Sequence, residues 1–165
     1  MILERLRPHP HRGDVIAAGA VPLSVAAFLI ELRMTGWPVG ARFVVVALIA
    51  ALLLTMGWLA PLEGEGESPR AYHSVLLVAG LLPMLVALVL LAEMLGADRP
   101  PGSGGLFWVF AAEAVIAGLT ARHARSAVCT LIAALAALVA VEEVVAWALE
   151  PSGAGGSTGL MVRPP

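Results

Sequence analysis

The sequence contains no lysine, a single cysteine and few charged residues of either sign. All ten basic residues are arginines, and charged residues make up 13% of the chain, against about 25% in a typical soluble domain. The arginines form no basic stripe, so the chain lacks the electrostatic surface that nucleic-acid binding needs. The lone Cys129 has no second cysteine with which to form an intrachain disulfide.

The chain also lacks the short motifs that accompany common enzyme chemistry. It contains no GxSxG nucleophile elbow, no HExxH zinc motif, no lysine-bearing phosphate loop and no CxxC pair. The segments outside the apolar runs are too short to fold as a separate catalytic domain. We therefore expect no enzymatic activity, no bound cofactor and no metal site.

Long apolar runs are what the sequence has in abundance, and hydrophobic residues make up 59% of it. A helix needs about 20 mostly apolar residues to cross a bilayer. Four runs carry no charge, and a fifth is interrupted only by Glu113. These runs cover residues 15–30, 43–62, 71–92, 126–141 and, for the fifth, 106–121. The pattern predicts an all-α fold, a polytopic transmembrane helical bundle with five spans.

The predicted bundle is one unit over residues 14–149. A polar, interfacial lead-in covers residues 1–13, and a Gly-, Ser- and Pro-rich tail over residues 150–165 is expected to be disordered. The fourth span is the shortest, so four spans plus a re-entrant segment is the alternative. The five predicted spans are residues 14–34, 41–61, 71–96, 106–121 and 126–149.

The distribution of arginine predicts the orientation of the bundle, because short cytoplasmic loops are enriched in basic residues. A cytoplasmic N-terminus and an external C-terminus place six arginines inside and four outside. The same assignment places His73 and His123 at the cytoplasmic ends of the third and fourth spans. We expect a multi-pass protein of the plasma (cytoplasmic) membrane. The inside arginines are Arg5, Arg7, Arg12, Arg70, Arg122 and Arg125, and the outside ones are Arg33, Arg42, Arg99 and Arg163.

Five glutamates lie within the predicted spans, all in the outer half of the membrane in this orientation. An acid at the centre of a membrane helix costs roughly 2.5–3.5 kcal/mol and usually faces the bundle interior. Glu93 is close to the end of its span, so we expect its side chain to reach the interface by snorkelling. The remaining acids and one arginine form the predicted intramembrane polar or proton site: Glu143, Glu113, Glu31, Glu142 and Arg42.

The two adjacent acids of the last span lie on different helix faces. Glu143 shares its face with Ala136 and Ala140, whereas Glu142 shares its face with larger side chains, including Leu138. Small faces let membrane helices approach closely. The small face should therefore point into the bundle, and Glu143 is the stronger candidate for an interior acid.

These features favour a protein that works by packing with other membrane helices. Its expected partners are the lipid bilayer and, through small-residue pairs such as Ala133 and Ala137, further copies or other proteins. We expect a structural or accessory membrane subunit. The alternative is a small transporter, or a proton- or cation-translocating bundle, that uses the outer-half carboxylates.

Overall fold

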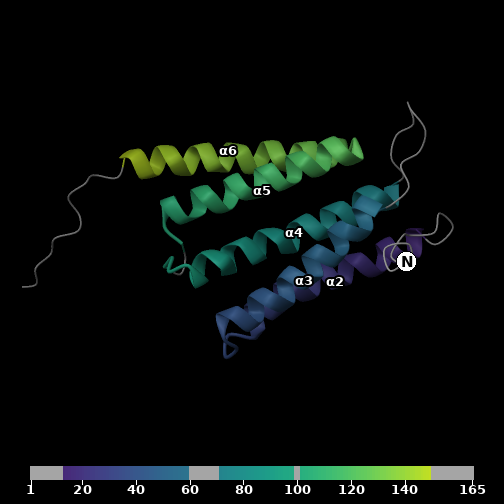
Figure 1. Ribbon diagram of the computed structural model, residues 1–165, viewed down its shortest axis with the longest axis horizontal. Helices are drawn as coiled ribbons and strands as arrows, with labels where there is room; N and C mark the ends of the chain where they lie inside the picture. The colour runs from purple at the N-terminus through teal and green to yellow at the C-terminus, as the bar shows by residue number, and fades with distance from the viewer. Residues whose placement is uncertain (1–12, 60–70, 99–100, 150–165) are drawn as a thin grey trace, which may run out of the picture.

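Five α-helices make up nearly all of the described structure (Figure 1). The computed structural model describes residues 13–59, 71–98 and 101–149, and within them it contains no strand. Each helix is long and apolar enough to cross a bilayer, which confirms the predicted five-span helical bundle. Apart from Gly13, the predicted lead-in and tail lie outside the described residues. The helices are α2 (Gly13–Arg33), α3 (Val39–Leu59), α4 (Ala71–Met94), α5 (Ser103–Ala124) and α6 (Ala127–Leu149).

Four of the helices agree closely with the predicted spans, but α5 is longer than predicted. It has 22 residues, about 33 Å of helix at 1.5 Å per residue, whereas the prediction gave residues 106–121. Arg122 and His123 continue its last turn, where basic side chains interact favourably with the helix dipole. The expectation of a short fourth span was wrong, and the reason for considering a re-entrant segment disappears with it.

A tight turn joins α5 to α6 and makes them an antiparallel hairpin. Arg125 adopts the left-handed conformation, with φ at 51°, and its backbone N–H donates to the carbonyl of Ala121. Ser126 then caps α6, because its Oγ accepts the backbone N–H of Cys129 at 3.5 Å. We call this end of the bundle, where α3 also ends and α4 begins, the hairpin end.

Helix α4 is the centre of the bundle. It contacts α2, α3 and α5, and it buries twelve residues. Helix α6 lies at the opposite extreme, because it packs almost entirely on α5 and buries only Cys129, Ala136 and Ala140. Figure 1 shows the result: α2 and α3 lie on one side of α4, and the α5–α6 hairpin lies on the other.

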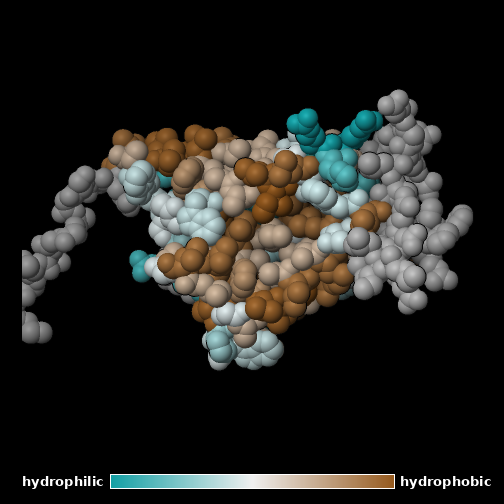
Figure 2. All heavy atoms as spheres, in the orientation of Figure 1, coloured by the Kyte–Doolittle hydropathy of each residue, from teal (hydrophilic) through white to brown (hydrophobic). Residues whose placement is uncertain are grey.

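The surface has the pattern expected of a protein in lipid. Figure 2 shows apolar side chains over the middle of the molecule and a group of hydrophilic side chains at the hairpin end. Arg122 and Arg125 are exposed at this end. The middle of the bundle is therefore suited to hydrocarbon, and the turn of the hairpin to water or lipid headgroups.

Two glycines allow α3 and α4 to pack closely. A Cβ atom added at Gly80 would lie 2.9 Å from the backbone nitrogen of Leu54 and 2.9 Å from its Cγ atom. One added at Gly57 would collide with the side chain of Leu77. The backbone of α3 can yield little at Leu54, so the helix spacing depends on Gly80 lacking a side chain.

Replacing Gly80 with alanine should destabilise the α3–α4 pair. Overpacking of this kind costs about 1–3 kcal/mol of unfolding free energy, measurable by denaturant titration in detergent micelles. Gly118→Ala in α5 is the matched control, because its added Cβ would meet no heavy atom within 4 Å. Equal losses for the two substitutions would contradict the close approach of α3 to α4.

The five-helix arrangement also predicts which turns share a side of the membrane. In a Cys129→Ala background, single cysteines at Thr35 and Asp98 should react with a membrane-impermeant maleimide from one side. A cysteine at Arg122 should react only from the other side, because α5 crosses between Asp98 and Arg122. All three positions are exposed. Labelling of all three from one side would mean that α5 does not cross.

Candidate functional site

Arg42 is the most buried charged residue that the structure describes, with 2% of its surface exposed. It lies in the first turn of α3, just after the turn that leads out of α2. Its backbone N–H donates to the carbonyl of Pro38 at 3.2 Å, which starts the helix. Because α3 begins beside the ends of α2 and α4, the guanidinium reaches both neighbouring helices.

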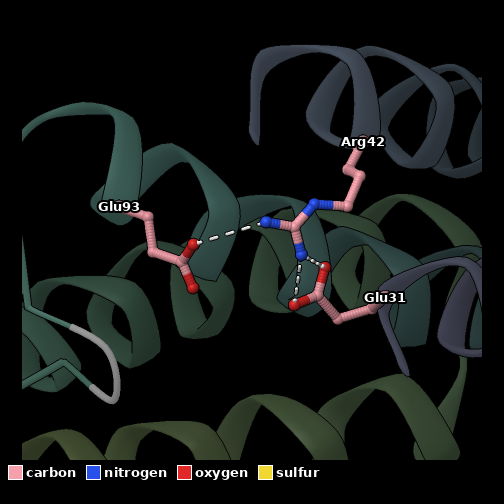
Figure 3. Close-up of polar contacts among 3 residues, drawn as sticks. All are labelled: Glu31, Arg42 and Glu93. Atoms are coloured by element: carbon pink, nitrogen blue, oxygen red, sulfur yellow. Dashed lines mark hydrogen bonds and ion pairs between the residues drawn. The ribbon is translucent and has the colours of Figure 1, made fainter. Parts of the chain in front are cut away.

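Two carboxylates from different helices face this guanidinium (Figure 3). Nη1 of Arg42 donates to both oxygens of Glu31 in α2, at 3.1 and 3.0 Å. Nη2 lies 4.0 Å from Oε2 of Glu93 in α4. The side chains of Arg42 and Glu93 are 3% and 8% exposed. We call Glu31, Arg42 and Glu93 the Arg42 cluster, and the end of the bundle that contains it the cluster end.

The Arg42 cluster joins three helices by paired charges. A buried ion is stable only when its partners replace the water that it has lost, and the planar guanidinium suits this because it can donate in several directions. With all three groups ionised, one positive and two negative charges leave a formal charge of −1. The Nε atom of Arg42 has no hydrogen-bond partner among the described residues.

The sequence placed Glu31 and Arg42 in the same half of the membrane, and the structure brings them into direct contact. The expectation for Glu93 was wrong, because its carboxylate turns towards Arg42 instead of snorkelling to the interface. One signal could have identified Glu93 beforehand. Glu93 and Arg42 lie at the same end of the bundle, and a guanidinium in an apolar bundle is stabilised by a nearby carboxylate.

Glu113 lies apart from the Arg42 cluster, in the middle of α5. It is 3% exposed, and its Oε2 atom has no hydrogen-bond partner among the described residues. Together with side chains of α4 and α6, it lines an apolar cavity. Within the described part of the chain, this carboxyl group is thus buried with one hydrogen-bonding position open.

The two adjacent acids of α6 have different surroundings. Ala136 and Ala140 are buried, which confirms that the small face of α6 points into the bundle, and Glu143 on that side is half-buried. Glu142, one residue earlier, is exposed. No ion pair within the described residues joins either acid to Arg42.

The hairpin end carries a second group of polar contacts. The indole nitrogen of Trp58 donates to Oγ1 of Thr120 at 3.3 Å, and its ring stacks on His123 with ring centroids 4.7 Å apart. These contacts tie the end of α3 to the end of α5. His73 is buried nearby and forms a hydrogen bond with the backbone of Gly57. The sequence predicted that both histidines lie at this end, but it did not predict their contacts.

No family model, no curated protein and no solved structure matches this chain. In the described residues, no three His, Cys, Asp or Glu side chains converge as metal ligands. The structure divides these glutamates into two groups by their distance from Arg42. Glu31 and Glu93 share a buried arginine and hold helices together, whereas Glu113 and Glu142 lie away from that arginine.

Removing the guanidinium should strongly destabilise the bundle, because Arg42→Ala leaves two carboxylates without their shared cation. Breaking a buried ion pair in this way costs about 3–5 kcal/mol of unfolding free energy, measurable by denaturant titration in micelles. Arg33→Ala is the matched control, since Arg33 is an exposed arginine at the same end. Replacing Glu31, Arg42 and Glu93 together with leucine should restore most of the loss. A loss for Arg33→Ala as large as that for Arg42→Ala would refute the structural role of the cluster.

Proposed function

We propose that this protein is a non-enzymatic accessory subunit that packs along α6 against a transmembrane helix of a different membrane protein. The observation that carries the proposal is the position of Glu142, an acid on the outward side of a membrane-spanning helix. The burial pattern of α6 and the depth of Glu142 support it.

Helix α6 has one face on α5 and presents the rest of its surface outwards. The side chains around Glu142 are large, apolar and exposed: Leu138 is 65% exposed and Val145 is 49% exposed. An apolar outward face alone suits lipid as well as protein. Glu142 is the exception, because hydrocarbon offers a carboxyl group no hydrogen-bond partner.

The depth of Glu142 makes its exposure costly. It lies seven residues before the last residue of α6, which at 1.5 Å per residue is about 10 Å from the helix end. An acid at the centre of a membrane helix costs roughly 2.5–3.5 kcal/mol, and Glu142, which lies one turn from the centre of α6, bears part of that cost. A partner helix with a hydrogen-bond donor at this depth, such as arginine, asparagine or serine, offsets some of that cost, about 1–2 kcal/mol in model peptides.

Charge complementarity favours a different protein over a second copy of this chain. A parallel symmetric pair of α6 helices would bring one Glu142 against the other, and two ionised carboxylates would repel each other with no donor between them. A partner with a basic or amide side chain supplies the donor that the symmetric pair lacks. The Arg42 cluster supports the same role, because it holds α2, α3 and α4 together as a platform for the hairpin.

The proposal includes the orientation of the bundle in the membrane. The arginine distribution supports a cytoplasmic N-terminus in the plasma membrane. Both the Arg42 cluster and Glu142 then lie in the outer half of the bilayer, and a partner donor is expected there.

A proton- or cation-translocating bundle is the second candidate, and the buried carboxyl of Glu113 favours it. It ranks second because Oε2 of Glu113 has no hydrogen-bond partner among the described residues that could continue a proton path. Flux measured in proteoliposomes, with Glu113→Gln as the comparison, tests this candidate directly.

Photo-crosslinking in the native membrane tests the proposed subunit. A photoreactive residue at Leu138 should crosslink to one membrane protein whose contacting helix carries a donor at the depth of Glu142. Glu142→Leu should reduce that yield by about tenfold, while the melting midpoint of the isolated protein stays unchanged or rises. A photoreactive residue at Leu29, exposed on α2, is the matched control. Crosslinks from Leu138 to lipid only, or to further copies only, would sink the proposal, as would an unaltered yield in Glu142→Leu.

A further inference from the structure

An apolar groove of about 320 Å³ lies between α2 and α4, and Val128 in the first turn of α6 also lines it. Its walls are exposed: Val25 of α2 by 51%, Leu82 of α4 by 44% and Val128 by 46%. The groove is therefore accessible from the outer surface of the bundle. In a membrane, this apolar surface meets the acyl chains of lipids.

The groove has the length and position of one acyl chain in a single leaflet. Along α4 it extends from Ser74 to Leu82, which is about 12 Å at 1.5 Å per residue. One leaflet contributes about 15 Å to the hydrocarbon core. Ser74 lies in the first turn of α4, and Val128 is the second residue of α6. The groove thus begins at the hairpin end and runs along the helices towards the middle of the membrane.

The turn between α5 and α6 brings positive charge to the beginning of the groove. Oγ of Ser74, which lines the groove, lies 3.4 Å from Oγ of Ser126 in this turn. Arg125 directly precedes Ser126, is exposed, and forms no ion pair within the described residues. Arg122 adds a second exposed arginine, and residues 121–127 contain no acid. An accessible guanidinium therefore lies at headgroup level, beside the end of an apolar groove.

We propose that this groove binds an anionic phospholipid, with one acyl chain along α2 and α4 and the phosphate against Arg125. A planar guanidinium matches the oxygens of a phosphate group, and basic sites between membrane helices bind anionic headgroups. A zwitterionic lipid offers the same acyl chain, but its own cation competes with Arg125 for the phosphate. The groove therefore holds the chain, and the turn selects the charge. The proposal does not depend on the partner proposed for Glu142.

The other end of α2 provides an internal comparison. Arg33 is exposed, like Arg125, but it lies at the cluster end. The groove reaches only as far as Phe28 on α2, about 7 Å of helix before Arg33. Arg33 therefore has the charge of Arg125 without its position at the beginning of the groove.

Photo-crosslinking of a lipid to the full chain tests the proposal. The probe is phosphatidylglycerol with a diazirine in one acyl chain, diluted into phosphatidylcholine nanodiscs. We expect its adducts, mapped by mass spectrometry, to concentrate on the groove residues of α2 and α4. Unlabelled phosphatidylglycerol should displace the probe at a lower mole fraction than unlabelled phosphatidylcholine does. Equal displacement by the two lipids, or adducts spread evenly over the exposed surface, would overturn the proposal.

Arginine variants test the headgroup contact. Arg125→Gln should weaken binding of the probe by about fivefold, which corresponds to about 1 kcal/mol for one arginine near the membrane surface. Arg33→Gln is the matched control and should leave binding unaltered. Equal probe binding in the native protein and in Arg125→Gln would contradict the contact between Arg125 and the phosphate.

A third pair of variants tests the acyl-chain contact separately. Val25→Trp places a large side chain in the groove while Arg125 stays in place. It should abolish the groove adducts without lowering the melting midpoint, because Val25 is exposed and the added ring needs no space in the core. Val115→Trp is the matched control, since Val115 is 62% exposed on α5 and does not line the groove. Unchanged adducts in folded Val25→Trp would also overturn the proposal.

Discussion

A guanidinium buried among apolar helices needs carboxylate partners, and in this protein that requirement determines how three helices meet. Arg42 reaches Glu31 on one side and Glu93 on the other. Any arrangement that separated α2, α3 or α4 at the cluster end would leave a charge in a medium that cannot solvate it. The glycine contacts between α3 and α4 add a steric constraint to two of these three helices. Polar pairing at the cluster end and close packing along the helices thus act together.

The number and approximate position of the helices could be predicted from the sequence, because each apolar run is long enough to span hydrocarbon. The meeting of Glu31 and Arg42 was also within reach, since only a short turn separates their helices. The sequence could not predict that the side chain of Glu93 is buried, or that one carboxyl oxygen of Glu113 has no hydrogen-bond partner among the described residues. Membrane helices are apolar on every side, so the sequence periodicity that orients a helix in a soluble protein is weak here. Which neighbours a side chain meets then depends on how the helices pack, as α6 illustrates by contacting little except α5.

The acids of this bundle show how surroundings determine what a carboxyl group can do. Glu31 and Glu93 each form an ion pair with Arg42, and these ion pairs hold helices together. Glu113 is buried beside an apolar cavity, whereas Glu142 is exposed on the outward surface of α6. The same type of side chain therefore links helices at Glu31 and Glu93, is buried with an oxygen that has no partner among the described residues at Glu113, and is the proposed contact to another protein at Glu142.

The spacing of the Arg42 cluster along the chain has a consequence for biosynthesis. Glu31 and Arg42 are 11 residues apart, so both belong to the α2–α3 hairpin, which is synthesised before α4. The hairpin can enter the membrane with these charges already paired, at a lower cost than two separate ions. Glu93 can join only after α4 has been synthesised, and the α5–α6 hairpin is made after α4 and is attached mainly through contacts between α4 and α5. The order of synthesis thus matches an assembly in which each newly made helix meets a partner that is already in place.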